Sequence, residues 1–434
     1  MDEYNKFFKI NEFIRDNIYY CKNDFSCNGK ESNSAVLLGL LTAALNGKML
    51  FLGEYGLGKT TLSETISSLY FGIPLSVTES SSIKGNPELS YESIIGRPDM
   101  GELNKGIEKI VWSDFVLSKT KIVDEINRIP SHKQNILLTG MQTNTWKYLN
   151  NVIMTEPCPW FATKNYKDSG NNGIIPPLLD RFDISVESKN PGLNNTRLIR
   201  YSEKINLNYE DIAAAYSVLI FNKDILYEDY LDGTNLLRNE YVARIKNDLN
   251  LDLLSDEERN NIRNQILSKD FDEDSNYFLD VLYSELGSCQ LFGQKRTNES
   301  CPDDCHYSNY ACFNIKNSLS VRTINTIDNY SKALAWAMND KEVNVNHISS
   351  ILPYALNHKL IFNENELQSR EHKSRKESVQ LQTTIDILEE IKKRAGKIKH
   401  DQIDIVSLIL NKKIIEAEKK SKTMDHPVFK EYMK

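Results

Sequence analysis

The residues best suited to chemistry are Gly53–Thr60, which read G-E-Y-G-L-G-K-T. Glycines let backbone N–H groups approach an anion closely, and a lysine that opens a helix adds charge at the positive helix N-terminus. The pattern G-x-x-x-x-G-K-[ST] therefore predicts a phosphate-binding loop for a nucleoside triphosphate. The residues expected to bind the nucleotide are Gly53, Glu54, Tyr55, Gly56, Leu57, Gly58, Lys59, Thr60 and Thr61.

Two carboxylates, Asp124 and Glu125, follow the apolar pair Ile122 and Val123. A carboxylate at the carboxyl end of a strand can hold Mg²⁺ together with the hydroxyl of the phosphate loop, here Thr60. We expect Lys59 to contact the β and γ phosphates, Asp124 and Thr60 to bind magnesium, and Glu125 to polarise the attacking water. The alternative is a strand that merely ends in solvated acids.

These side chains need a strand, a turn and a helix to position them. The apolar run Met49–Leu52 predicts a buried strand directly before the loop. Apolar Leu62, Ile66 and Leu69 fall on one face of a helix that begins at Lys59. The fold class that these elements indicate is α/β.

Longer motifs continue from the two carboxylates. Residues 124–130 read D-E-I-N-R-I-P and are followed by Q at 134 and L-L at 137–138. This stretch resembles the MoxR-type AAA+ ATPases of the helix-2-insert clade. Three segments match in the family's order: F-A-T-K-N at 161–165, P-L-L-D-R-F at 177–182 and S-V-R at 320–322. The resemblance implies that Asn165 holds the attacking water with Glu125. Arg322 would contact the γ phosphate from a helical lid, and Arg181 would reach it from the neighbouring subunit.

The resemblance covers residues 34–192 and 318–361, and it implies ATP, Mg²⁺ and a homo-oligomeric, hexameric ring. The resemblance implies two kinds of partner. One is a protein client, which the ATPase remodels or matures by inserting a cofactor or metal, and the other is a protein with a von Willebrand factor A domain. The chain departs from the family at Gly29-Lys30, where Gly-Gln is usual, and at Val321, which replaces a proline. Residues 200–317 are also longer than the usual connection.

The fold expected is an AAA+ P-loop core with a parallel sheet, then an all-α lid with a helical insertion and a helical tail. Its parts are an N-terminal helix and linker (1–33), the core (34–192), the lid (193–361) with an acidic insertion at about 203–317, and a charged tail (362–434). Two hairpins are expected, one formed by segments 80–102 and 109–115 and the other by segment 145–154. The resemblance implies that these hairpins contact substrates or partners. In the second hairpin, Trp146 and Tyr148 are either core residues or surface anchors. Helical patterns in the tail run over 383–395 and 402–420.

Four of the seven cysteines lie within 24 residues, with the spacing C-x11-C-x3-C-x6-C: Cys289, Cys301, Cys305 and Cys312. Thiolates brought together by turns can bind Zn²⁺ or an iron-sulfur cluster. The spacing fits no standard finger or ferredoxin run, so unliganded thiols remain the alternative.

Composition narrows the class of protein. The net charge is −7 over 434 residues, and no basic stripe is visible, which makes nucleic acid an unlikely partner. No apolar run approaches the ~20 residues of a membrane span, and no signal peptide is apparent, so we expect a cytoplasmic protein. Two alternatives stay open: a nucleic-acid-associated AAA+ motor, and a nucleotide-binding module without turnover.

Overall fold

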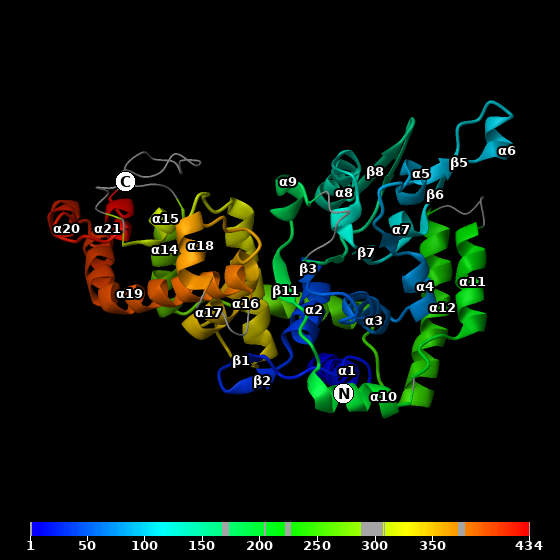
Figure 1. Ribbon diagram of the computed structural model, residues 1–434, viewed down its shortest axis with the longest axis horizontal. Coiled ribbons are helices and arrows are strands. Elements are labelled where there is room, and N and C mark those ends of the chain that lie inside the picture. Colours follow the sequence, from blue (N-terminus) through cyan, green and yellow to red (C-terminus); the bar gives the residue numbers. More distant parts are fainter. Residues whose placement is uncertain are drawn as a thin grey trace. The chain divides into compact units, whose positions relative to one another are not determined.

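The protein is described by a computed structural model that covers residues 2–166, 173–203, 205–221, 227–287, 307, 309–371 and 378–433. The chain divides into two compact units, Met1–Gln265 and Ile266–Lys434 (Figure 1). Each unit is described by itself below. None of the helices in these ranges is long and apolar enough to cross a membrane.

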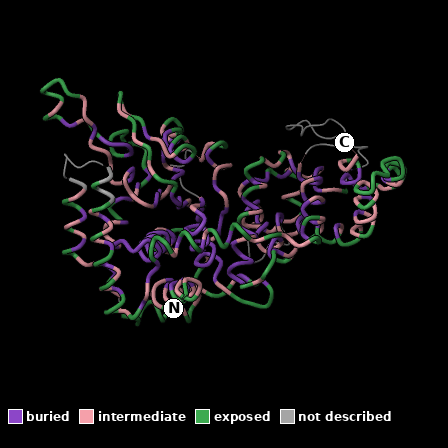
Figure 2. Tube along the Cα trace, turned by 180° about the vertical axis from the view of Figure 1, so that it is seen from behind, coloured by how far each residue is buried: buried purple, intermediate pink, exposed green. Residues whose placement is uncertain are grey.

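A five-stranded parallel sheet forms the centre of the first unit, in the order β11-β3-β10-β7-β4. This confirms the predicted α/β class. Most residues of the inner strands β3, β7 and β10 are buried, as expected for a sheet covered on both faces. Figure 2 colours buried residues purple. The strands are β3 (Lys48–Leu52), β4 (Ile83–Lys84), β7 (Lys121–Asp124), β10 (Trp160–Lys164) and β11 (Ile184–Glu187).

Helices α2 (Ser34–Leu45) and α3 (Lys59–Phe71) flank β3 in the sequence. Every residue of α2 is buried, which is typical of a helix that is hydrophobic all round. The Asn33 side chain caps its start by accepting a hydrogen bond from the N–H of Val36, at 3.1 Å. The N-terminal elements are α1 (Glu3–Asn17), β1 (Phe25–Cys27) and β2 (Lys30–Ser32).

Both expected hairpins are present. Strands β5 (Gly96–Pro98) and β6 (Ile110–Trp112) form one, and β8 (Thr145–Tyr148) and β9 (Asn151–Met154) form the other. Trp146 is 2% exposed and stacks on Trp160, so it is a core residue rather than a surface anchor. Short helices connect these strands: α4 (Leu75–Ser80), α5 (Tyr91–Ile94), α6 (Met100–Leu103), α7 (Asp114–Leu117), the 3-10 turn Ile126–Arg128, α8 (Ser131–Thr143) and α9 (Pro176–Leu179).

The helices after the sheet are α10 (Gly192–Tyr201), α11 (Glu210–Phe221), α12 (Tyr227–Leu249) and α13 (Asp256–Leu267). Helix α12 is tied to the core through Arg238, which is buried and donates to the carbonyl of Phe71 at 2.7 Å. The hydroxyl of Tyr241, also on α12, lies 3.1 Å from that of Ser68 on α3. Helices α10–α12 thus belong to the first unit, although the sequence favours a lid that starts at residue 193.

In its described ranges, the second unit is built of helices joined by loops, with two isolated β-bridges. Its centre includes Glu285 on α14, which is fully buried and accepts two hydrogen bonds from Arg394, at 2.9 and 2.6 Å. Arg394 lies in a single long helix that spans all of the first helical pattern expected in the tail and the start of the second, which continues in α20. The long helix contains Gly396, at a tolerable cost of ~1 kcal/mol, and no proline. The helices are α14 (Glu273–Leu286), α15 (Ala311–Asn314), α16 (Val321–Ala337), α17 (Val345–Leu356), α18 (Glu364–Glu371), α19 (Val379–Leu410), α20 (Ile414–Ser421) and α21 (Pro427–Glu431).

Candidate active site

The phosphate loop connects β3 to α3 in a conformation that requires glycine. Gly53, Gly56 and Gly58 have φ angles of 143°, 72° and 71°, which L-residues with a side chain rarely adopt. The N-cap of α3 is Gly58, which has no side chain that could accept a hydrogen bond from the first N–H groups of that helix. These N–H groups are therefore available to an anion, as the sequence predicts.

The ammonium group of Lys59 lies in this loop and is buried. It donates to the carbonyl oxygens of Gly53 and Glu54, at 3.0 and 2.6 Å, and to Oδ1 of Asn165 at 2.9 Å. Burial lowers the pKa of Lys59, and the charges of Asp124 and Glu125 oppose that shift. Lys59 is thus held by neutral oxygen atoms that phosphate oxygens can replace.

The register of the sheet brings Thr163 and Asp124 together, and Thr60 reaches the same carboxylate from α3. Ala162 on β10 pairs with Val123 on β7, so the next residues, Thr163 and Asp124, are neighbours at the carboxyl edge. The hydroxyls of Thr60 and Thr163 both donate to Oδ1 of Asp124, each at 2.6 Å. A hydroxyl and a carboxylate are hard oxygen ligands that suit Mg²⁺, so the residues present fit this ion.

Glu125 is fixed from both sides. Its Oε1 accepts a hydrogen bond from Nδ2 of Asn165 at 2.9 Å, and its Oε2 lies 3.0 Å from Nη1 of Arg128. The backbone of Glu125 has a φ angle of 50°, which is uncommon for residues other than Gly, Asn or Asp. Backbone strain of this kind occurs at functional sites. Gly85 permits this turn, because a Cβ there would lie 2.2 Å from the carbonyl oxygen of Glu125.

The structure therefore gathers Lys59, Thr60, Asp124, Glu125 and Asn165 at one edge of the sheet, as the sequence suggests. Their chemical roles stay predictions. Tyr55 and Thr61 are exposed beside them.

Sequence reasoning gave no role to two residues of this site. Thr163 links the carboxylate of Asp124 to the backbone of Glu125, since its hydroxyl donates to Asp124 and accepts from the N–H of Glu125 at 2.9 Å. Gln134 is fully buried and donates to the carbonyls of Ile129 and Gly173, both at 2.8 Å, while accepting from the N–H of Ile175 at 2.9 Å. It connects the turn after Glu125 to the segment before α9. The glutamine in the family-like motif was the available signal for this residue.

The two remaining residues predicted for the site are arginines. Arg181 follows α9 and donates to Oε1 of Gln142 at 2.5 Å and to the carbonyl of Pro177 at 3.4 Å. Arg322 is exposed in the first turn of α16, in the second unit. The contact of each with a γ phosphate stays a prediction.

The predicted cysteine cluster lies mostly outside the described residues, which exclude Cys289, Cys301 and Cys305. Cys312 is buried, with its sulfur 4.0 Å from the carbonyl oxygen of Tyr307. Within the described ranges, no group of three or more His, Cys, Asp or Glu side chains could hold a metal ion. Binding of Zn²⁺ or an iron-sulfur cluster stays a prediction.

Comparisons with known proteins agree with this geometry. Residues 48–182 match the family model described as "AAA domain (dynein-related subfamily)". A crystal structure described as that of "a putative ATPase" from Cytophaga hutchinsonii is similar in fold, with a TM-score of 0.57 and 17% sequence identity over 90% of this chain and 95% of that chain. No curated protein sequence matches the chain significantly. The segment from the phosphate loop to Phe182 is thus the α/β core of an AAA+ domain, followed by a helical region.

Proposed function

We propose that the protein hydrolyses ATP in this site. The observation that carries the proposal is a continuous row of polar contacts from Lys59 through Asn165 and Glu125 to Arg128. Beside it, Thr60 contacts Asp124. The row joins a phosphate-binding cation to a carboxylate that can orient water, which are the two functions that phosphoryl transfer to water needs.

Each residue has a distinct task. Lys59 exchanges its carbonyl partners for phosphate oxygens when nucleotide enters, and Asn165 then keeps Glu125 directed at the space beside the phosphates. Glu125 accepts a hydrogen bond from the attacking water, while Arg128 fixes its second oxygen. Thr60 and Asp124 would hold Mg²⁺, which neutralises charge on the phosphates when bound.

We further propose a ring of identical subunits, in which Arg181 reaches the γ phosphate of the neighbouring subunit. A guanidinium stays charged and is worth ~10³ to 10⁵ in rate when supplied in trans to a phosphoryl-transfer site. The match to an AAA domain supports the proposal, because AAA+ proteins commonly form rings. The sequence resemblance to MoxR-type proteins supports a hexamer that matures a protein client, with a von Willebrand factor A protein as partner.

The test of the ring mixes two inactive variants. Arg181→Ala should keep ATP affinity near wild type but lose most turnover, and Lys59→Ala should lose ATP binding. A mixture should regain part of the activity, because an intact Lys59 of one subunit can meet an intact Arg181 of another. Arg197→Ala, an exposed arginine on α10, is the matched control and should turn over like wild type.

Light scattering must first show mixed assemblies. If these form and no phosphate release returns, Arg181 does not act across the interface, and Arg128 becomes the better candidate. If no variant, including wild type, releases phosphate from Mg-ATP, the hydrolysis proposal itself is wrong.

The cysteine cluster is a separate proposal about bound metal. We expect about one Zn²⁺ or one iron-sulfur cluster per chain, lost in a Cys301→Ser, Cys305→Ser double variant, because thiolate ligands bind together. Elemental analysis of anaerobically purified protein that finds neither metal would contradict it.

A further inference from the structure

A cavity of about 290 Å³ lies within the first unit, away from the phosphate loop. It is lined by residues that precede three strands: Asn46 before β3, Lys119 before β7, and Cys158 before β10. Because the strands are parallel, these residues mark the amino edge of the sheet, opposite the edge that carries the nucleotide site. The cavity approaches the ~300 Å³ at which small-molecule sites begin, and it has the volume of about ten waters.

Positive charge gathers in this cavity. Lys119, Arg259 and Arg263 line it, together with two carboxylates, Asp256 and Glu156. Arg259 is only 8% exposed and donates to the carbonyls of Tyr70 and Leu254, at 3.3 and 3.0 Å.

One carboxylate is shared between two buried arginines. Asp256 pairs with Arg259 and also lies 3.3 Å from Nη1 of Arg238. Lys119 has a neutral partner, the side-chain oxygen of Asn235 at 3.2 Å. Among the described residues, Arg263 has no ion-pair partner. The protein thus supplies less negative charge than these cations require.

The pKa values agree with this imbalance. Burial and the nearby charge of Arg238 together lower the pKa of Arg259 to about 9. Burial and the same two arginines lower the pKa of Lys119 to about 8. A bound anion would oppose both shifts.

A buried hydroxyl also points to a ligand. Tyr70 lines the cavity and is 1% exposed, and its hydroxyl has no hydrogen-bond partner within the described chain. The charges of Arg259 and Arg263 act on this phenol, so it lies near both cations. A buried donor without a partner costs ~1–3 kcal/mol, a cost that an acceptor in the cavity would remove.

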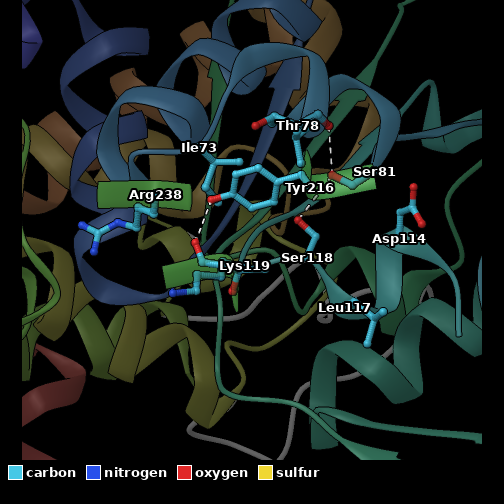
Figure 3. A pocket seen from close by; sticks show the side chains of 11 residues that line it. Ile73, Thr78, Ser81, Asp114, Leu117, Ser118, Lys119, Tyr216 and Arg238 are labelled. Carbon is cyan, nitrogen blue, oxygen red and sulfur yellow. Dashed lines mark hydrogen bonds between the residues drawn. The ribbon is translucent and has the colours of Figure 1, made fainter. Parts of the chain in front are cut away.

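A smaller cavity shares the wall formed by Leu117, Ser118 and Lys119. Figure 3 shows Lys119 beside Tyr216, whose hydroxyl donates to the carbonyl of Thr234 at 3.1 Å. The smaller cavity has a volume of about 30 Å³, which admits only water. The ligand space is therefore the larger cavity.

We propose that the larger cavity is an anion site that binds one phosphate-bearing small molecule through Lys119, Arg259, Arg263 and the hydroxyl of Tyr70. Phosphate has the several acceptor oxygens that these donors need, and guanidinium groups match it in geometry. The phosphate is either free, as phosphate or pyrophosphate, or carried by a nucleotide.

The test uses a chain in which the phosphate loop is disabled. Calorimetric titration of Lys59→Ala with pyrophosphate, in low salt and EDTA, should show about one site per chain and a raised Tm. Adding Arg263→Gln to this background should weaken binding at least ~10-fold. Arg197→Gln, an exposed arginine on α10, is the matched control and should leave the affinity unchanged.

A second variant avoids the loss of a packed side chain. Asn260 is exposed and lines the cavity, so Asn260→Asp adds a negative charge with almost no change of shape, and it should also weaken pyrophosphate binding. If inorganic phosphate displaces pyrophosphate, the ligand is free phosphate. If ADP displaces pyrophosphate and inorganic phosphate does not, the ligand is a nucleotide.

Two results would overturn the proposal. One is the absence of heat and of a Tm shift with pyrophosphate, phosphate and ADP up to ~5 mM. The other is an affinity that neither Arg263→Gln nor Asn260→Asp changes. The outcome does not depend on ATP hydrolysis, because Lys59→Ala disables that site throughout.

Discussion

Replacing Glu125 with glutamine tests whether this carboxylate orients the attacking water. The substitution keeps the size of the side chain and one acceptor for Asn165, whose Nδ2 lies 2.9 Å from Oε1. It removes the ion pair with Arg128, which is 3.0 Å long between partly exposed groups. Such a pair contributes only ~0–1 kcal/mol, so the fold and the contact between Lys59 and Asn165 should persist.

The effect on catalysis should be much larger. A positioned general base contributes ~10²- to 10⁴-fold in rate, which is ~3–5 kcal/mol of transition-state stabilisation. We therefore expect Glu125→Gln to bind Mg-ATP within about threefold of wild type and to lose ~10²-fold or more in kcat. Affinity is measured with a fluorescent ATP analogue, and kcat by phosphate release at saturating Mg-ATP.

Glu257→Gln is the matched control, because it makes the same substitution at an exposed carboxylate on α13, outside the site. Its kcat should stay close to wild type. A kcat for Glu125→Gln within threefold of wild type would refute the role of this carboxylate. A loss of affinity as large as the loss of kcat would instead show that Glu125 acts in binding.

Two further predictions concern stability. Burial, with the charges of Glu79 and Asp124, raises the pKa of Glu64 from 4.5 to about 7. The folded protein therefore holds this proton more tightly than the unfolded chain, and the free energy of unfolding should fall as pH rises from 4.5 to 7. Above pH 7 the ionised group should cost at most ~3 kcal/mol. Glu64→Gln should flatten this dependence in urea unfolding at pH 5.5 and 8 without nucleotide or metal, and an unchanged slope would contradict it. Gly140→Ala should lower stability by ~1–3 kcal/mol, because its Cβ would lie 2.4 Å from the ring of Trp146. A Cβ at Gly396 would meet no atom of the described residues within 4 Å, so Gly396→Ala should instead stabilise α19 by ~1 kcal/mol. Equal Tm shifts in the two alanine variants would refute this contrast.

Local chemistry made the nucleotide site readable from the sequence. A loop that needs glycines and a lysine within eight residues is encoded by neighbours in the chain, so Gly53–Thr60 appears as a contiguous pattern. A buried parallel strand also appears in the sequence as an apolar run, and here that run ends at the polar residue Asp124. The class of fold follows from such alternation of strands and helices.

Contacts between distant segments were decided only by the tertiary structure. Gln134 bridges Ile129 and Gly173, and nothing in its own neighbourhood encodes the second partner. Trp146 could be core or surface by pattern alone, and its packing on Trp160 decided the matter.

The boundary between the two units also depends on contacts between segments that are distant in the sequence. The acid-rich segments after residue 203 predict an inserted helical subdomain, and the structure shows that Arg238 of this stretch donates to the carbonyl of Phe71. The cavity lined by Lys119 and Arg259 likewise combines residues 140 positions apart in a chain whose net charge is −7. Net charge and periodicity are sums over the sequence, whereas a site depends on which charges the fold places together and shields from water.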